Sequence, residues 1–203
     1  MLYFSAKHPH AMNTNQSLHQ DSQSTRSRGI PVLVALTLAG LLGLTGCASS
    51  PSVTQKTATG SVNKVVVKKS ERQIELQNSR GEVIRKYRVA LGGSPNGHKY
   101  REGDQRTPVG DYVLNWRKPN SQFYKAIHIS YPNERDKIAS RQLGYTPGGM
   151  IMLHGLPNYI QSESMRRLYV NRDWTHGCIA VQNHEMDEIW NLVPDGTPIR
   201  IMP

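Results

Sequence analysis

The residues best suited to chemistry in this chain are Cys178 and His154. Cys178 ends the tetrapeptide Thr175-His176-Gly177-Cys178, and His154 is followed by Gly155. Cysteine attacks as a thiolate, and a free thiol with a pKa of about 8.5 is only slightly ionised at neutral pH. A neighbouring imidazole can accept the thiol proton if a carboxylate or a backbone carbonyl orients it. The two residues therefore predict a cysteine nucleophile with a histidine base.

Glycines adjoin both reactive residues. Gly155 and Gly177 permit a close approach of other groups and unusual backbone angles. At Gly177 this freedom would let the N–H groups around Gly177 and Cys178 point at a developing oxyanion, where a single donor is worth roughly 2.7–4 kcal/mol. We expect an oxyanion-binding region here.

Sequence spacing leaves two alternatives open. His176 could be the proton acceptor in place of His154. His154, His176 and Cys178 could also be three zinc ligands with water in the fourth position. The chain has no CxxC or HExxH pattern, and a nucleophile explains the same residues, so we expect neither a metal nor a cofactor.

The other cysteine, Cys47, ends an apparent export signal at residues 1–46. The uncharged stretch Ile30–Leu44 is shorter than the roughly 20 residues that span a bilayer, and its length is typical of a signal peptide. Leu44-Thr45-Gly46-Cys47 resembles a bacterial lipobox, in which the cysteine is acylated and becomes the mature N-terminus. Cys178 would then lack a partner in an oxidising compartment, where an unpaired thiol needs a reason such as catalysis.

The signal also predicts where the protein acts. Ala48 follows the lipobox cysteine, which by resemblance to Gram-negative lipoproteins favours the outer membrane. We expect a lipid-anchored protein of the cell envelope, on the periplasmic face. Residues 1–46 hold three of the 25 basic and one of the 15 acidic side chains, which leaves a net charge of +8. Because of the export signal, we assign this charge to a solvated surface or to anionic envelope polymers and expect no nucleic-acid partner.

Residues 47–62 are rich in Ser, Thr, Gln and Gly, which predicts a flexible tether, and residues 63–203 are expected to form the folded domain. Its patterns are mainly those of β-strands, with one or two short helices. The one clear helix is expected at about His184–Leu192, with Asn183 as its N-cap. Strands are expected at residues 65–67, 73–77, 83–91, 111–116, 123–130, 150–154 and 198–202, with a hairpin turn at 78–81.

Two segments are expected to be loops. Residues 92–110 are rich in glycine and proline, and residues 155–177 connect the strand that ends at His154 to the Gly-Cys pair. A connection this long is unusual in a compact domain unless it is functional. We expect it to form a long loop over the active site, with a short helix near residues 162–169.

Three ordered motifs carry a family resemblance: Gly103-Asp104-Gln105-Arg106-Thr107-Pro108-Val109-Gly110-Asp111-Tyr112, Met152-Leu153-His154-Gly155, and Thr175-His176-Gly177-Cys178-Ile179-Ala180-Val181. Together they resemble the L,D-transpeptidase (YkuD-type) catalytic domain, over about residues 63–202. The resemblance implies an L,D-transpeptidase-type β-sandwich. It also implies that Cys178 is the nucleophile, that His154 is the base and that the Gly155 carbonyl orients His154.

The resemblance further implies the substrates. The thiolate would attack the carbonyl between the L-centre of a diamino acid and D-Ala in a peptidoglycan stem tetrapeptide. An amine of another stem peptide or of an envelope-protein lysine would then take the acyl group. Two alternatives stay open: a hydrolase that uses water as the acceptor, and a non-catalytic peptidoglycan-binding lipoprotein.

Contacts to the substrate are expected from four further residues. By resemblance His176 shapes the cleft, and Trp174 is a candidate cleft wall. Many relatives carry arginine where this chain has Ala180, so another arginine would have to bind a substrate carboxylate. Arg106 and Arg172 are the candidates, together with Arg141.

Overall fold

The structure, a computed structural model, describes residues 60–203 of the chain. The predicted signal peptide, Cys47 and most of the predicted tether lie outside the described residues. Within the described range, no helix is long and apolar enough to cross a membrane.

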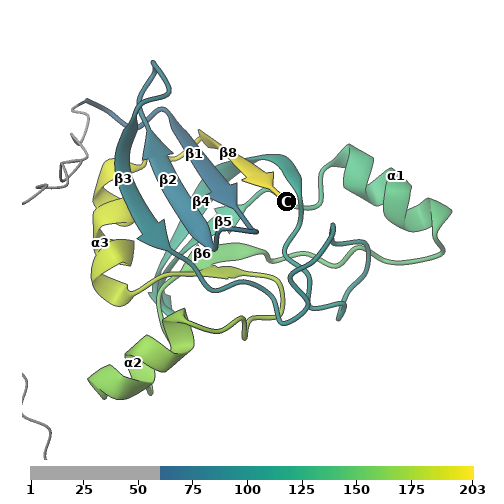
Figure 1. Cartoon of the computed structure of the whole chain (residues 1–203). Helices are drawn as coiled ribbons and strands as arrows, with labels where there is room; N and C mark the ends of the chain where they lie inside the picture. Colours follow the sequence, from purple (N-terminus) through teal and green to yellow (C-terminus); the bar gives the residue numbers. More distant parts are fainter. Residues whose placement is uncertain (1–59) are drawn as a thin grey trace, which may run out of the picture. The chain divides into compact units, whose positions relative to one another are not determined.

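Residues 60–203 form a mainly β fold with eight strands and three helices (Figure 1). The elements in chain order are β1 Lys64–Lys68, β2 Gln73–Gln77, β3 Val83–Arg88, β4 Gly110–Ser121, β5 Tyr124–Ile129, α1 Glu134–Gln142, β6 Met152–His154, α2 Glu163–Val170, β7 Ile179–Ala180, α3 Asn183–Leu192 and β8 Thr197–Met202. The predicted fold class is confirmed, and each predicted strand overlaps an observed one. The predicted number of helices was too low by at least one.

All eight strands belong to one sheet with the order β3-β2-β1-β8-β4-β5-β6-β7. β1 pairs with β8, and β6 with β7, in parallel, whereas the other neighbours are antiparallel. The two layers expected of a sandwich are thus parts of one curled, continuous sheet. α3 lies along one side of it, and α1 projects from the opposite side (Figure 1).

The core is built from the strand residues that point to one face of the sheet. Ile127, Leu153 and Ile179 are at most 1% exposed and lie on three neighbouring strands. Met186 and Ile189 of α3 pack into the same cluster and are fully buried. Since strand side chains alternate between faces, His154 must lie on the face opposite Leu153.

α3 begins one residue earlier than predicted. Gln182 is its N-cap and donates from its backbone N–H to Glu185 Oε2 at 2.8 Å. Asn183, the predicted N-cap, is the first helical residue, and its Oδ1 accepts a hydrogen bond of 2.8 Å from the Leu156 N–H. Asn183 therefore fixes the chain just after His154.

The sequence did not indicate α1. Its residues are mostly polar, and only Asp136 and Ser140 are buried, so it lacks the apolar stripe that reveals a helix. The available signal was at its start, where Asn133 and Asp136 form a reciprocal capping box.

Candidate active site

The sheet brings His154 and Cys178 to neighbouring strands. His154 is the last residue of β6 and pairs with Ala180, while Leu153 pairs with Ile179. Cys178 directly precedes β7, and its Sγ accepts a hydrogen bond of 3.4 Å from the Met152 N–H. The thiol thus lies against the backbone of the strand that ends at His154. No hydrogen bond joins the thiol to the imidazole in the described part of the chain.

His154 is buried, with only 3% of its surface exposed. Its Nδ1 lies 2.6 Å from the Gly155 carbonyl oxygen. Since a carbonyl can only accept, Nδ1 carries the proton and Nε2 has the free lone pair. Burial lowers the pKa of His154 to about 4, although the hydrogen bond to Gly155 acts in the opposite direction. The imidazole is therefore neutral at pH 7 and able to accept a proton at Nε2.

Gly155 has no room for a side chain. A Cβ there would lie 2.7 Å from Asn183 Oδ1 and 2.9 Å from the Tyr124 Cβ. The Gly155 N–H donates to the Lys125 carbonyl at 3.2 Å, which ties the residue to β5. The close packing holds this backbone where its carbonyl reaches the imidazole.

Cys178 is also held in its neutral form. Burial raises the pKa of the thiol, and the Met152 N–H and the charge of Lys99 offset only part of this effect. The Sγ lies 3.7 Å from the Met150 carbonyl, to which it can donate. At pH 7 the pair is thus a thiol and an imidazole, rather than a thiolate and an imidazolium.

Thr175 organises the turn before the nucleophile. Its Oγ1 donates to the Cys178 carbonyl at 2.7 Å and accepts from the Gly177 N–H at 3.1 Å. The Gly177 N–H is thus engaged within the turn, and the expected oxyanion role of this region stays a prediction. In residues 60–203 the Cys178 N–H makes no hydrogen bond, so it is the candidate oxyanion donor of this turn.

Gly177 is needed for packing as well. Its φ is +127°, and a Cβ there would lie 2.6 Å from the Arg106 carbonyl oxygen. On the other side, Gly93 donates to the Thr175 carbonyl at 3.0 Å, and the Thr175 N–H donates to Leu91 at 3.1 Å. The turn is therefore bonded to Leu91 and Gly93 at the start of the predicted 92–110 loop and packs against Arg106 near the end of that loop.

An ion pair anchors the segment that leads into the turn. Arg72 binds Asp173 through Nε at 2.9 and 3.1 Å and through Nη2 at 2.7 Å. Asp173 Oδ1 also accepts from the Leu91 N–H at 2.9 Å. Arg72 has a φ of +51°, an uncommon angle for a residue with a side chain. The Arg72–Asp173 pair thus connects the β1–β2 turn to the chain five residues before Cys178.

Aromatic rings cover His154. The ring centre of Phe123 lies 4.7 Å from that of His154, and the ring centre of Trp174 lies 5.8 Å away. Tyr169 packs edge-on against Trp174 at 5.2 Å. Trp174 therefore lies beside the imidazole, where a cleft wall was expected, although its buried indole Nε1 has no hydrogen-bond partner among residues 60–203.

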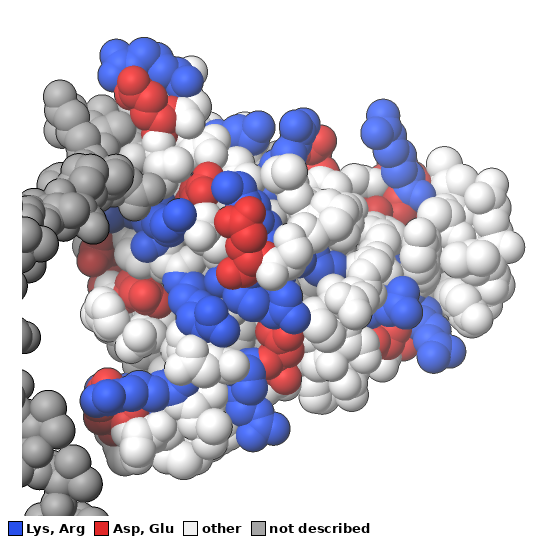
Figure 2. Space-filling model, viewed as in Figure 1, with Lys and Arg blue, Asp and Glu red and all other residues white. Residues whose placement is uncertain are grey.

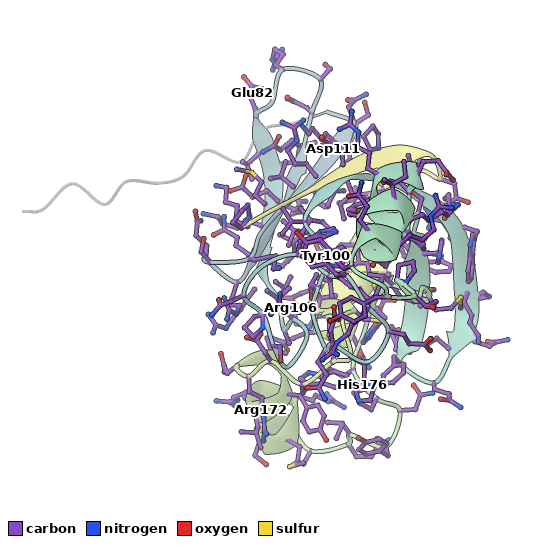
Figure 3. All side chains as sticks on the ribbon, turned by 90° about the vertical axis from the view of Figure 1, so that its right-hand side faces the viewer. Glu82, Tyr100, Arg106, Asp111, Arg172 and His176 are labelled. Carbon is purple, nitrogen blue, oxygen red and sulfur yellow. The ribbon has the colours of Figure 1, made fainter. Side chains whose placement is uncertain are left out.

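The other expected substrate contacts make no hydrogen bond with one another in residues 60–203; Figure 3 labels Arg106, Arg172 and His176. His176 is exposed, and its side chain makes no hydrogen bond in residues 60–203. Arg106 is half-buried, with Nη1 3.4 Å from the His98 carbonyl. Arg172 is exposed and lies beside α2, and Arg141 lies in α1. Ala180 is fully buried.

The zinc alternative requires three ligands close together. Among the described residues, no group of three His, Cys, Asp or Glu side chains could hold a metal ion. The residues His154, His176 and Cys178 thus do not form such a group.

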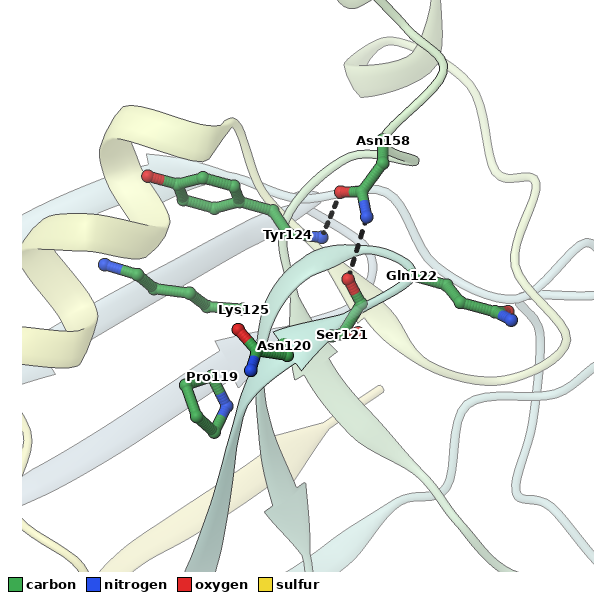
Figure 4. Close-up of a pocket in the computed structure, with 7 residues that line it drawn as sticks. All are labelled: Pro119, Asn120, Ser121, Gln122, Tyr124, Lys125 and Asn158. Atoms are coloured by element: carbon green, nitrogen blue, oxygen red, sulfur yellow. Dashed lines mark hydrogen bonds between the residues drawn. The ribbon is translucent and has the colours of Figure 1, made fainter.

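The connection after Gly155 is fastened to the β4–β5 hairpin. Asn158 Oδ1 accepts from the Tyr124 N–H, and its Nδ2 donates to the Ser121 carbonyl, each at 2.9 Å (Figure 4). These residues border a cavity of about 470 Å³ at the hairpin end. No role was expected for Asn158, Phe123 or Thr175. Of these three residues, only Thr175 could have been found from the sequence, through its place in the Thr-His-Gly-Cys motif.

Known proteins resemble this chain in sequence and fold. The sequence model of the YkuD family, described as the L,D-transpeptidase catalytic domain, matches residues 63–201. "Putative L,D-transpeptidase YafK" of Escherichia coli (strain K12) is 31% identical over 168 residues, which are 80% of this chain and 60% of that protein. The chain thus spans about 60% of the length of the curated relatives that it matches.

A solved structure of Pgp2 from Campylobacter jejuni, called a helical cell shape determining protein, is 25% identical with a TM-score of 0.54. The similarity covers 69% of this chain and 47% of that one. Together with the family match, these findings show that the chain belongs to the L,D-transpeptidase (YkuD) family.

Proposed function

We propose that this protein is a peptidoglycan L,D-transpeptidase in which Cys178 is the nucleophile and His154 the general base. The observation that carries the proposal is the state of His154, which is buried, neutral and bound through Nδ1 to the Gly155 carbonyl. His154, whose Nε2 is the free nitrogen, ends strand β6, and the Cys178 thiol lies against the backbone of that strand. The peptidoglycan substrate is supported by membership of the family.

In the first half-reaction, Sγ attacks the carbonyl carbon between the diamino acid and D-Ala, and His154 Nε2 takes the thiol proton. The Cys178 N–H is the donor that this turn offers to the oxyanion. When the tetrahedral intermediate collapses, the C–N bond breaks and the imidazolium returns the proton to the leaving D-Ala amine. A thioester on Cys178 remains.

In the second half-reaction, an amine of another stem peptide or of a protein lysine attacks the thioester. His154 takes the proton of the amine, the C–S bond breaks, and the thiol regains its proton. Water at the same position would give hydrolysis, and this is the second candidate activity. A role in cell shape, which the name of Pgp2 states for that protein, would follow from either activity.

Mass spectrometry tests the proposal directly. The purified full-length protein is incubated with a stem tetrapeptide, with and without a stem-peptide amine acceptor. We expect a thioester adduct on Cys178, free D-Ala and a cross-linked product. Cys178→Ser should form neither adduct nor product while it keeps its fold. Full turnover in this variant would refute the cysteine mechanism, and a free tripeptide as the sole product would assign the hydrolase.

We further propose that Cys47 anchors the protein by acylation, since it follows the lipobox-like Leu44-Thr45-Gly46. Several acyl chains on one residue would bind firmly, because each buried methylene contributes about 0.8 kcal/mol. Palmitate labelling in the native host should mark the parent protein and not Cys47→Ala. An unlabelled, soluble parent protein would refute the anchor and leave the catalytic proposal untouched.

A further inference from the structure

A polar cleft lies where the β1–β2 turn, the end of β3 and the chain after α2 meet. Its volume is about 520 Å³, and it is lined by residues 70–72, 88–89 and 170–173. Figure 2 shows that basic side chains gather on this part of the surface, between the ends of β1–β3 and α2. This surface is separate from the aromatic rings that cover His154, although both adjoin the segment before Cys178.

The cleft has more positive charge than its own carboxylates neutralise. Arg72 and Asp173 are paired with each other, and Glu71 lies 3.8 Å from Lys68. Arg88 and Arg172 remain, and within residues 60–203 neither has a hydrogen bond or an ion pair through its guanidinium. Both side chains are exposed, so their guanidinium donors are free to bind an anion in the cleft.

The type and size of the site indicate its ligand. A guanidinium presents a planar fork of N–H donors that matches the two oxygens of a carboxylate. The volume lies within the range of about 300–1,000 Å³ that is usual for organic ligands, and it exceeds the space that one small ion needs. The Asn171 Nδ2 already donates to the Arg167 carbonyl, so the two arginines are the main donors left to bind an anion.

The cleft is also linked to the nucleophile. Asp173 is part of its wall and bonds to the Leu91 N–H. The Leu91 carbonyl in turn accepts from the Thr175 N–H, and Thr175 binds the Cys178 carbonyl. One wall of the cleft is therefore joined through three hydrogen bonds to the turn that carries the thiol.

We propose that Arg88 and Arg172 form a carboxylate-binding subsite that holds a free carboxylate of a peptide substrate. The inference rests on the proposed function and assigns to this cleft the recognition of the anionic part of the stem peptide. Arg172 was expected from the sequence as a substrate contact. The sequence did not indicate that Arg88 lines the same cleft.

Calorimetric titration of the full-length Cys178→Ala protein, which cannot turn over, tests the subsite. The probes are a stem tetrapeptide with free carboxylates, the same peptide with its carboxylates amidated, and inorganic phosphate. We expect Arg88→Gln and Arg172→Gln each to raise the Kd of the free peptide roughly tenfold, since each removes a charged hydrogen bond. The matched control is Arg80→Gln, because Arg80 lies in the exposed β2–β3 turn and pairs with Glu82; this Kd should not change.

The amidated peptide should bind more weakly, and the arginine substitutions should not weaken it further. An unchanged Kd in both arginine variants, or no binding of the free peptide, would overturn the subsite. Phosphate that binds as tightly as the peptide would overturn the assignment to a carboxylate. Thioester formation by the parent enzyme is measured separately. If the thioester forms while the Arg variants bind normally, only this inference fails; if no thioester forms, the proposed function itself fails.

Discussion

The turn at residues 175–178 and the connection at residues 156–171 are separated by three residues in sequence but differ in how they are held. In the turn, Thr175 and Gly177 are buried and bonded on both sides. In the connection, Tyr159 is 73% exposed, and Met165 and Leu168 are 40% and 48% exposed. α2 is stabilised locally, by the Ser162 cap and an exposed Arg167–Glu163 pair.

The difference separates two tasks. A nucleophile and its base work only when they are held to within a fraction of an ångström, which needs packed and bonded surroundings. The exposed apolar side chains of the connection contribute little to that geometry and are available to a partner or a substrate. If this division is correct, substitutions in the turn should alter catalysis and stability strongly, and substitutions in the connection should not.

The largest effect is expected from the buried histidine. His154→Ala should lower the turnover rate by about 10²–10⁴, the usual contribution of a positioned general base. His176→Ala should have a smaller effect, because His176 is exposed and its side chain makes no hydrogen bond within residues 60–203. Single-turnover thioester formation measures both. The opposite ranking would transfer the role of the base to His176.

Adding one methyl group should break the packing of the turn. Gly177→Ala places a Cβ 2.6 Å from a backbone oxygen at a φ of +127°, which should reduce the free energy of unfolding by about 3 kcal/mol or more. Gly103→Ala is the control, since its φ is +76° and nothing lies within 4 Å of the added Cβ; its strain is about 1–2 kcal/mol. Urea titrations compare the two variants, and equal losses would contradict close packing at Gly177.

Stability should depend on pH through His154. Its pKa is lowered from 6.5 to about 4 in the folded state, so the unfolded chain binds more protons between these values. Folding stability should therefore fall as the pH falls from 6.5 to 4, by up to about 3 kcal/mol. His154→Gln removes this titration, so the difference in unfolding free energy between parent and variant should shrink towards pH 4. A difference that stays constant with pH would show that the buried imidazole does not titrate in this way.

Two ion pairs offer the smallest and most closely matched comparison. Asp173→Asn weakens the half-buried pair with Arg72, and we expect a loss of about 2 kcal/mol together with slower thioester formation. Glu163→Gln removes the exposed pair with Arg167, which should cost less than about 0.5 kcal/mol. Thermal unfolding measures both. Similar losses would mean that the two regions are equally tightly held.

Most strands could be predicted because β-branched and alternating residues mark them, as in Val65–Val67 and Gln73–Gln77. The proximity of His154 and Cys178 could be expected only through the family resemblance, because the parallel pairing of β6 with β7 joins residues 26 positions apart. The pairing of Arg72 with Asp173, across 101 positions, has no local signal. The occupied N–H of Gly177 was missed as well, because it depends on the orientation of the Thr175 hydroxyl.

A thiol that stays protonated is also a poor target for oxidants. Peroxides and disulfides react with thiolates far faster than with thiols, and burial raises the pKa of Cys178. Residues 60–203 contain no second cysteine that could rescue an oxidised sulfur by forming a disulfide. In an oxidising compartment, the chemical lifetime of this thiol would therefore depend on the same burial that raises its pKa.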